Sequence, residues 1–404
     1  MFVFEDDDKQ ETPKLADMIV RFCCSKTRRL IPVAVEVHYK HASLDPVSIS
    51  CRDDLSVHIP NADFATLIVA TPYAMNWRTL VGGPRDGEIY ECRKFEFEDL
   101  LKWRSPCGVE TDHDANGFSV GVIDIGFSSF KEFDGLEMVS DRTDTDLPRE
   151  SHGSRVSRVI GKKRSDFVSG ICSNVNIIMY DVGYSTPDGK DSGKWATESV
   201  IDAIYFLAEQ KGCKVINISG GLNRGTDSIG LLNAVRFAKS LGVICVAAAG
   251  NVGAEGIVAP AVYDEVIGVG GIGVCSMAPP GSFTGFIESQ ARKFGLISKR
   301  AAGHHFFHDI NTSFGKGLDV VAPSVGVVLP VGDDQVMDLA GTSYAAPVVS
   351  SILALIASND IIVSNCVGEA RWKRLKELLY NACYDLGLPK EKQGMGLPIW
   401  SARA

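Results

Sequence analysis

Four polar side chains in this sequence have the types that acyl transfer by a serine nucleophile requires. In chain order they are Asp124, His152, Asn251 and Ser343. A serine hydroxyl near neutral pH is a poor nucleophile and needs a base within hydrogen-bonding reach. A neutral histidine can be that base if a buried carboxylate fixes its tautomer and stabilises the imidazolium that forms. A side-chain amide can stabilise the oxyanion beside a backbone N–H.

Ser343 stands at the start of a long apolar segment. The stretch 339–356 opens with Gly341-Thr342-Ser343 and continues in a helical pattern without a polar face. Such a helix must be packed on all sides inside a domain. Its unpaired N–H groups and positive end would favour an anionic oxygen beside Ser343. Taken alone, the position also fits a simple N-cap, because Ser and Thr begin many helices for hydrogen-bonding reasons.

From about residue 117 onward, apolar strands alternate with helices. Strands are expected at 118–124, 175–181, 214–219 and 243–249, and helices at 198–211 and 229–241. This alternation predicts a mostly parallel sheet covered by helices on both faces, which is a three-layer α/β domain. Ligands of such sheets bind at the carboxyl ends of the strands, where we expect Asp124, Ser219 and Asn251.

The first part of the chain has a different pattern. Strand-like runs at 31–38 and 65–70 and a short helical run at 95–103 are separated by charged and turn residues. We interpret this part as a small α/β appendage without a catalytic motif of its own. Two domains are therefore expected, an N-terminal appendage at 1–110 and a catalytic domain at 111–404.

Composition excludes several classes of partner. The net charge of −9 argues against general nucleic-acid binding, and no apolar run approaches the length of about 20 residues that spans a membrane. The acidic N-terminal stretch lacks the basic and apolar parts of a signal peptide. The eleven cysteines include no C-x-x-C pair, and the adjacent Cys23 and Cys24 have no further cysteine or histidine at metal-ligand spacing. These features predict a cytoplasmic protein and leave its oligomeric state open.

The four segments resemble the signatures of the subtilisin-like serine proteases. Asp124 lies in Val-Ile-Asp-Ile-Gly, His152 in Ser-His-Gly-Ser, Asn251 in Ala-Ala-Gly-Asn, and Ser343 in Gly-Thr-Ser-Tyr-Ala-Ala-Pro. The resemblance covers about residue 115 to the end and implies a serine endopeptidase. In that interpretation Asp124 orients the base, His152 is the general acid and base, and Ser343 is the nucleophile. Asn251 and the Ser343 amide would form the oxyanion hole.

Three positions depart from the family pattern. Ile125 stands where a hydroxyl residue is usual, Ser154 replaces threonine, and Tyr344 replaces methionine. Ile125 removes one hydrogen bond that Asp124 could otherwise receive. The expected consequence is lower efficiency and not a different class of reaction.

The resemblance also implies where a peptide substrate would bind. The edge strand and the walls of the specificity pocket would be formed by Ser219, Gly220, Gly221, Ala248 and Gly250, and Val258 would lie at the pocket floor. None of these residues is charged, and an unpaired cationic side chain would be costly to bury there. The nearby acid Glu255 lies in a glycine-flanked loop that we expect to be solvated. The sequence therefore predicts apolar P1 residues of medium size, with Val258 limiting the depth of the pocket.

The stretch 276–312 is longer than the connection expected at this place in the family. It carries His304, His305 and His308, which have no Cys or Glu partner at ligand spacing. A surface loop is therefore favoured over a zinc site. No metal or cofactor is predicted. Structural calcium sites are frequent in the family, but no acidic loop here matches one.

Two other classes of function are compatible with parts of the sequence. One is a catalytically idle member of the fold that acts as a binding scaffold, against which the complete set of four residues argues. The other is a nucleotide-binding domain that uses the glycines at 268–273, a stretch that opens no obvious helix.

The appendage could act on the catalytic domain as a pro-segment or as a regulatory module.

Overall fold

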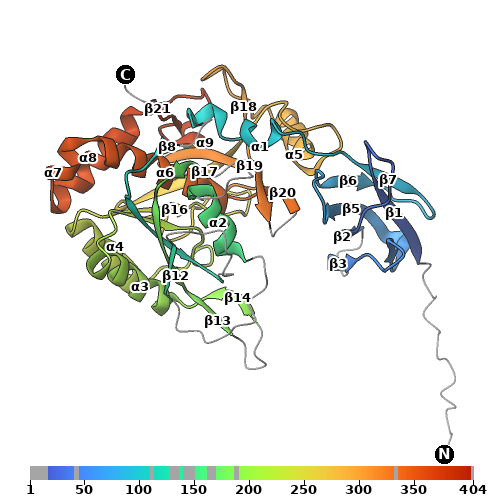
Figure 1. Ribbon diagram of the computed structural model, residues 1–404, viewed down its shortest axis with the longest axis horizontal. Helices are drawn as coiled ribbons and strands as arrows, with labels where there is room; N and C mark the ends of the chain where they lie inside the picture. The colour runs from blue at the N-terminus through green and yellow to red at the C-terminus, as the bar shows by residue number, and fades with distance from the viewer. Residues whose placement is uncertain are drawn as a thin grey trace, which may run out of the picture. The chain divides into compact units, whose positions relative to one another are not determined.

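The computed structural model of the protein describes residues 17–40, 45–109, 113–126, 136–139, 151–161, 170–185, 191–331 and 335–401. These residues form two compact units (Figure 1). The smaller unit comprises the described residues up to Lys94 together with Gly281–Phe283, and the larger unit comprises the rest.

The boundary between the units lies at Lys94–Phe95, earlier than the expected one at residue 110. The segment between these points contains α1 (Asp99–Lys102) and packs within the larger unit. Trp103 is 1% exposed, and its indole N–H donates to the Val328 carbonyl at 3.2 Å. This segment therefore belongs to the core of the larger unit.

The larger unit is organised around one sheet with the strand order β10-β12-β9-β15-β16-β17-β19-β20, and β18 pairs with β17. Its strands are β9 (Ser119–Asp124), β10 (Leu136–Val139), β12 (Asn176–Asp181), β15 (Val215–Ile218), β16 (Ile244–Ala248), β17 (Val266–Val274), β18 (Phe306–His308), β19 (Val320–Val331) and β20 (Gln335–Ala340). Only the pairs β17–β18 and β19–β20 are antiparallel among the described strands of this sheet. The apolar character of β15, β16 and β17 follows from burial on both faces.

Helices pack on this sheet in two groups. The larger helices are α2 (His152–Ile160), α3 (Thr197–Tyr205), α4 (Ile229–Ser240), α5 (Phe283–Lys293), α6 (Thr342–Asn359) and α8 (Gly368–Asn381). Helix α2 packs against α6, and α3 packs against α4. The expected three-layer α/β fold is confirmed.

Helix α6 is the central helix of the larger unit. By length and composition it could cross a membrane, but 83% of it is buried inside the protein. It lies against β15, β16, β17 and β19. The absence of a polar face is therefore explained by packing on all sides, and α6 is a core helix.

The smaller unit consists of two sheets, β4-β1-β7 and β3-β2-β5-β6. Their strands are β1 (Met18–Cys24), β2 (Val33–Tyr39), β3 (Val47–Ser50), β4 (Ser56–Ile59), β5 (Ala65–Pro72), β6 (Thr79–Gly82) and β7 (Ile89–Cys92). Alternating apolar residues such as Val33, Val35 and Val37 form its core. The helix expected at 95–103 lies in the larger unit, so the described part of the smaller unit is built of strands and one 3₁₀ turn and is not an α/β mixture.

The stretch 276–312 is not the expected surface loop. It contains α5 and the strand β18, which pairs antiparallel with β17. Phe306 and Phe307 are fully buried, and a Cβ on Gly273 would lie 2.1 Å from the Phe307 ring. The prediction was wrong because it weighed the three histidines and overlooked the two aromatic residues between them. The glycines at 268–273 belong to the buried strand β17 and not to a phosphate-binding loop.

Candidate active site

Asp124 ends strand β9 at the carboxyl edge of the sheet. Its side chain is 3% exposed, and Oδ1 accepts the Ile125 N–H at 2.6 Å. The same oxygen lies 2.7 Å from Nδ1 of His152. Oδ2 is buried and has no hydrogen-bond partner in the part of the chain that the structure describes. This is the consequence expected from Ile125, which offers no hydroxyl.

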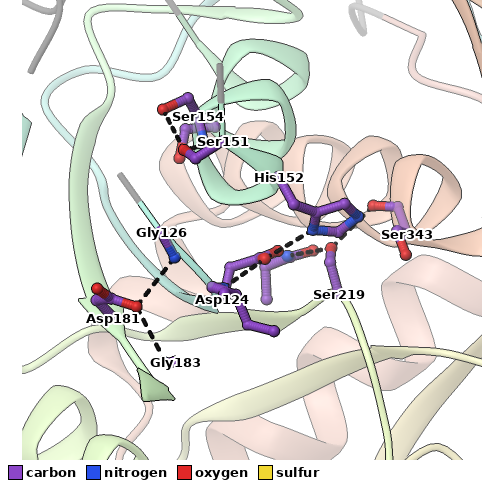
Figure 2. Close-up of polar contacts among 12 residues, drawn as sticks. Asp124, Gly126, Ser151, His152, Ser154, Asp181, Gly183, Ser219 and Ser343 are labelled. Atoms are coloured by element: carbon purple, nitrogen blue, oxygen red, sulfur yellow. Dashed lines mark hydrogen bonds and ion pairs between the residues drawn. The ribbon is translucent and has the colours of Figure 1, made fainter. Parts of the chain in front are cut away.

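His152 is the first residue of α2. The Ser151 hydroxyl caps the helix by accepting the Ser154 N–H at 3.3 Å, and the Gly153 N–H donates to the Ile125 carbonyl at 3.1 Å. The imidazole remains 34% exposed. In Figure 2 the His152 ring is drawn between the Asp124 and Ser343 side chains. With Nδ1 held by the carboxylate, Nε2 is the nitrogen available to other groups.

Ser343 lies in the first turn of α6. The N-cap of this helix is Gly341, with a φ of 134°, so the interpretation of Ser343 as a simple N-cap does not hold. The Ser343 carbonyl accepts the Ser219 hydroxyl at 2.8 Å. Next along the helix, the Tyr344 ring lies 5.9 Å from the His152 ring, measured between centroids. These contacts fix the start of α6 beside both His152 and the end of β15.

Asn251 follows strand β16 and lies across from the same turn. Its Oδ1 accepts the Thr342 N–H at 2.8 Å and the Thr342 hydroxyl at 3.0 Å. Because the oxygen is engaged in this way, the amide orientation is fixed and the Nδ2 donors point elsewhere. A Cβ on Gly341 would lie 3.4 Å from Nδ2, so glycine leaves this side of the amide open. Asn251 itself is exposed.

Five of the six substrate-binding residues expected from the sequence lie at or just beyond the ends of β15 and β16. Ser219, Gly220 and Gly221 follow β15, whereas Ala248 ends β16 and Gly250 follows it. The Val258 side chain lies close to two of them. A Cβ on Gly221 would approach Val258 to 2.5 Å, and one on Gly250 would approach it to 3.3 Å. Val258 therefore occupies the space between the two predicted pocket walls.

Two residues beside the site were missed by the sequence reasoning. The Trp195 indole covers Gly220, because a Cβ on that glycine would lie 1.5 Å from the ring. Asp181 ends β12 in register with Asp124 and is 5% exposed. In the sequence, Asp181 ends an apolar strand in the same way as Asp124 does, and this pattern could have identified it.

The histidines of the stretch 276–312 and the cysteines were the residues weighed as metal ligands. His308 is 1% exposed, and Nδ1 of His305 pairs with the Ser298 carbonyl at 3.1 Å. The described part of the chain contains no group of three His, Cys, Asp or Glu residues arranged to hold a metal ion. All eleven cysteines, Cys23 and Cys24 included, are free thiols.

Comparison with known proteins identifies the family. The subtilase family model (peptidase S8) matches residues 115–396, and the chain belongs to this family. The thermophilic serine proteinase of Bacillus sp. (strain AK1) is 28% identical over 251 residues, which are 60% of this chain and 53% of that protein. The major intracellular serine protease of Bacillus subtilis (strain 168) is 29% identical over 242 residues, 58% of this chain and 62% of that protein. The chain thus spans less than two thirds of the length of these two relatives.

Other relatives and solved structures agree. Subtilisin DY of Bacillus licheniformis is 30% identical over 249 residues, 59% of this chain and 76% of that protein. The structure of the prenylagaramide maturation protease PagA superposes with a TM-score of 0.52 at 20% identity, covering 74% of this chain and 94% of that one. A cold adapted subtilisin-like serine proteinase gives 0.51 at 23% identity, covering 72% and 92%. These structures establish the subtilisin-like fold.

Proposed function

We propose that this protein is a serine endopeptidase that hydrolyses peptide bonds through an acyl-enzyme. The observation that carries the proposal is the 2.7 Å contact between His152 Nδ1 and the buried Asp124 carboxylate, with Ser343 on the other side of the ring (Figure 2). A buried carboxylate in this position orients the imidazole and stabilises the imidazolium. Membership of the subtilase family supports the same class of reaction.

The proposed reaction begins at the Ser343 hydroxyl. Nε2 of His152 takes the hydroxyl proton while Oγ attacks the scissile carbonyl carbon, and it then delivers that proton to the leaving amine. Nε2 then takes a proton from water while the water oxygen attacks the acyl carbon, and it returns this proton to Ser343 Oγ as the acyl C–O bond breaks and the carboxylic acid leaves. Throughout, Asp124 holds Nδ1–H and remains ionised.

The oxyanion that forms on the substrate carbonyl would meet two donors. One is Nδ2 of Asn251, whose orientation is fixed because Oδ1 accepts from Thr342. The other is the backbone N–H of Ser343 in the first turn of α6, where the helix leaves N–H groups unpaired. Such donors act mainly on charge that exists only in the transition state.

We further propose an apolar P1 specificity of medium size. Val258 lies between Gly221 and Gly250 and would limit the depth of the pocket. Glu255 is exposed, as expected, and its carbonyl accepts from the Arg224 guanidinium. A cation already lies beside Glu255, which further disfavours a cationic P1 side chain.

The competing hypothesis is a catalytically idle fold used as a binding scaffold. Labelling of the full chain with a fluorophosphonate probe, followed by peptide mass spectrometry, separates the two. The proposal requires the adduct on Ser343 and its loss in the His152→Ala variant, since the hydroxyl then lacks its base. An intact protein that takes up no probe would support the scaffold instead.

A further inference from the structure

Asp181 makes two contacts that connect it to the candidate site. Its Oδ1 accepts the Gly126 N–H at 3.0 Å and the Gly183 N–H at 3.0 Å (Figure 2). The carboxylate is 5% exposed and lies at the end of β12, where Asp181 is the register partner of Asp124. A buried carboxylate is costly unless it receives hydrogen bonds of this kind. The two N–H groups supply them.

The turn that Asp181 holds carries both halves of the His–Asp contact. In this turn the Ile125 N–H donates to Asp124 Oδ1, and the Ile125 carbonyl accepts the Gly153 N–H. Gly153 directly follows His152 at the start of α2. The Gly126 carbonyl also packs against this helix, because a Cβ on Gly153 would lie 2.6 Å from it. Moving Gly126 would therefore displace the acid and the base relative to each other.

We propose that Asp181 is a positioning residue for the Asp124–His152 pair, acting through the turn 124–126 and touching neither substrate nor reacting atoms. This inference rests on the proposed serine endopeptidase function. Its physical basis is that catalysis depends steeply on geometry, so that a displacement of about 1 Å can cost on the order of a hundredfold in rate. The register of β9 and β12 brings Asp181 to this position, although it lies 57 positions after Asp124 in sequence (181 − 124).

Three variants of the full chain test the proposal. Asp181→Ala removes the acceptor for both N–H groups, whereas Asp181→Asn keeps an oxygen at the Oδ1 position. Asp319→Ala is the matched control, because the Asp319 carboxylate also accepts a backbone N–H, from Gly268 at 2.8 Å. Asp319 directly precedes β19 and so lies at the amino end of that strand, whereas Asp181 lies at the carboxyl end of β12. Peptide hydrolysis gives kcat and KM, and hydrogen exchange with mass spectrometry reports the amides of 119–126 and 151–157.

In Asp181→Ala we expect kcat to fall at least tenfold, with KM within about twofold and faster exchange in both peptides. Asp181→Asn should restore most of kcat and near-normal exchange. Asp319→Ala should lower the melting temperature without either effect. The proposal is overturned if Asp181→Ala leaves exchange in both peptides unchanged, or if Asp181→Asn is as impaired as Asp181→Ala. The exchange measurement holds even if the parent chain hydrolyses no peptide, an outcome that would refute the proposed function separately.

Discussion

Asp124 holds His152 through one carboxylate oxygen, at 2.7 Å from Nδ1, and that same oxygen also accepts the Ile125 N–H. The imidazole is thereby fixed so that Nε2 is the nitrogen turned away from Asp124, as a general base for Ser343 requires. The second oxygen of Asp124 is buried without a partner among the described residues. A hydroxyl side chain at position 125 could donate a hydrogen bond to this oxygen, which the Ile125 side chain cannot do. Substitution of Ile125 therefore tests whether the missing hydrogen bond limits catalysis.

We predict that Ile125→Ser raises kcat by a few-fold without changing KM. A new hydrogen bond would satisfy the buried carboxylate oxygen that is otherwise unpaired among the described residues, and leaving such an atom unpaired costs about 1–3 kcal/mol. Ile125→Ala is the control, since it shortens the side chain without adding a hydroxyl. Equal rates for the serine and alanine variants would show that the departure at 125 does not limit catalysis.

For the oxyanion hole, Asn251→Ala should lower kcat by roughly 10²–10³-fold with little change in KM. Asn251→Asp is the informative companion, because it keeps the oxygen that accepts from Thr342 and replaces the Nδ2 donor with an anionic oxygen that would repel the oxyanion. The kcat of Asn251→Asp should fall at least as far as that of Asn251→Ala. Wild-type turnover in Asn251→Asp would assign Asn251 to holding the turn and not to the oxyanion.

The site and the sheet were predictable from sequence because their determinants are local. Asp124 ends an apolar strand, Asn251 follows another, and the apolar run after Ser343 predicts a buried helix. The place of Asp181 at the end of a strand has a local sign, but its contact with the turn after Asp124 depends on strand register, and the Trp195–Gly220 contact likewise joins residues far apart in the chain. The predicted boundary at residue 110 differs from the observed one at Phe95 because the apolar residues of 95–109 pack on the larger unit. A local sequence pattern predicts a helix but not the hydrophobic core against which that helix packs.

That boundary leads to a prediction about truncation. The fragment 95–404 should unfold at a higher temperature than 111–404, which lacks Phe95, Trp103 and Cys107, all at most 3% exposed. Deleting one buried Phe or Trp side chain commonly costs about 3–5 kcal/mol. Thermal melts of both fragments provide the measurement, and equal melting temperatures would contradict it.

The same fragments test the smaller unit. We propose that it assists folding of the larger unit or regulates it. If so, 95–404 should differ from the full chain either in refolding yield or in peptide hydrolysis. A fragment that matches the full chain in both would leave the smaller unit with neither role.

Stability should depend on pH through His308. Burial, followed by the charge of Lys392, lowers the pKa of His308 from 6.5 to about 4. The unfolded chain then binds a proton at higher pH than the folded one, so stability is fully present above about pH 6.5 and is lost as the pH falls toward 4. The loss amounts to at most about 3 kcal/mol. Urea unfolding at several pH values should show this slope in the parent and a weaker one in His308→Leu; identical slopes would exclude His308 as its source.

Specificity is best tested at Val258, with matched tetrapeptides that carry Leu, Phe, Lys or Glu at P1. Leu should be cleaved best by the parent. In Val258→Gly the pocket deepens and the preference should move toward Phe, by about 1–3 kcal/mol in relative kcat/KM. Lys outperforming Leu in the parent would contradict the apolar pocket and point to Glu255.

The most direct test of the central claim is the turnover of a peptide substrate by the parent chain and by Ser343→Ala, each shown to be folded by circular dichroism. Replacing one small side chain by another at the start of α6 should preserve the fold. The account predicts hydrolysis by the parent and a kcat lower by several orders of magnitude in the variant. The small remaining rate enhancement would come from the oxyanion hole. Equal turnover by the two purified proteins would contradict the assignment of Ser343 as the nucleophile.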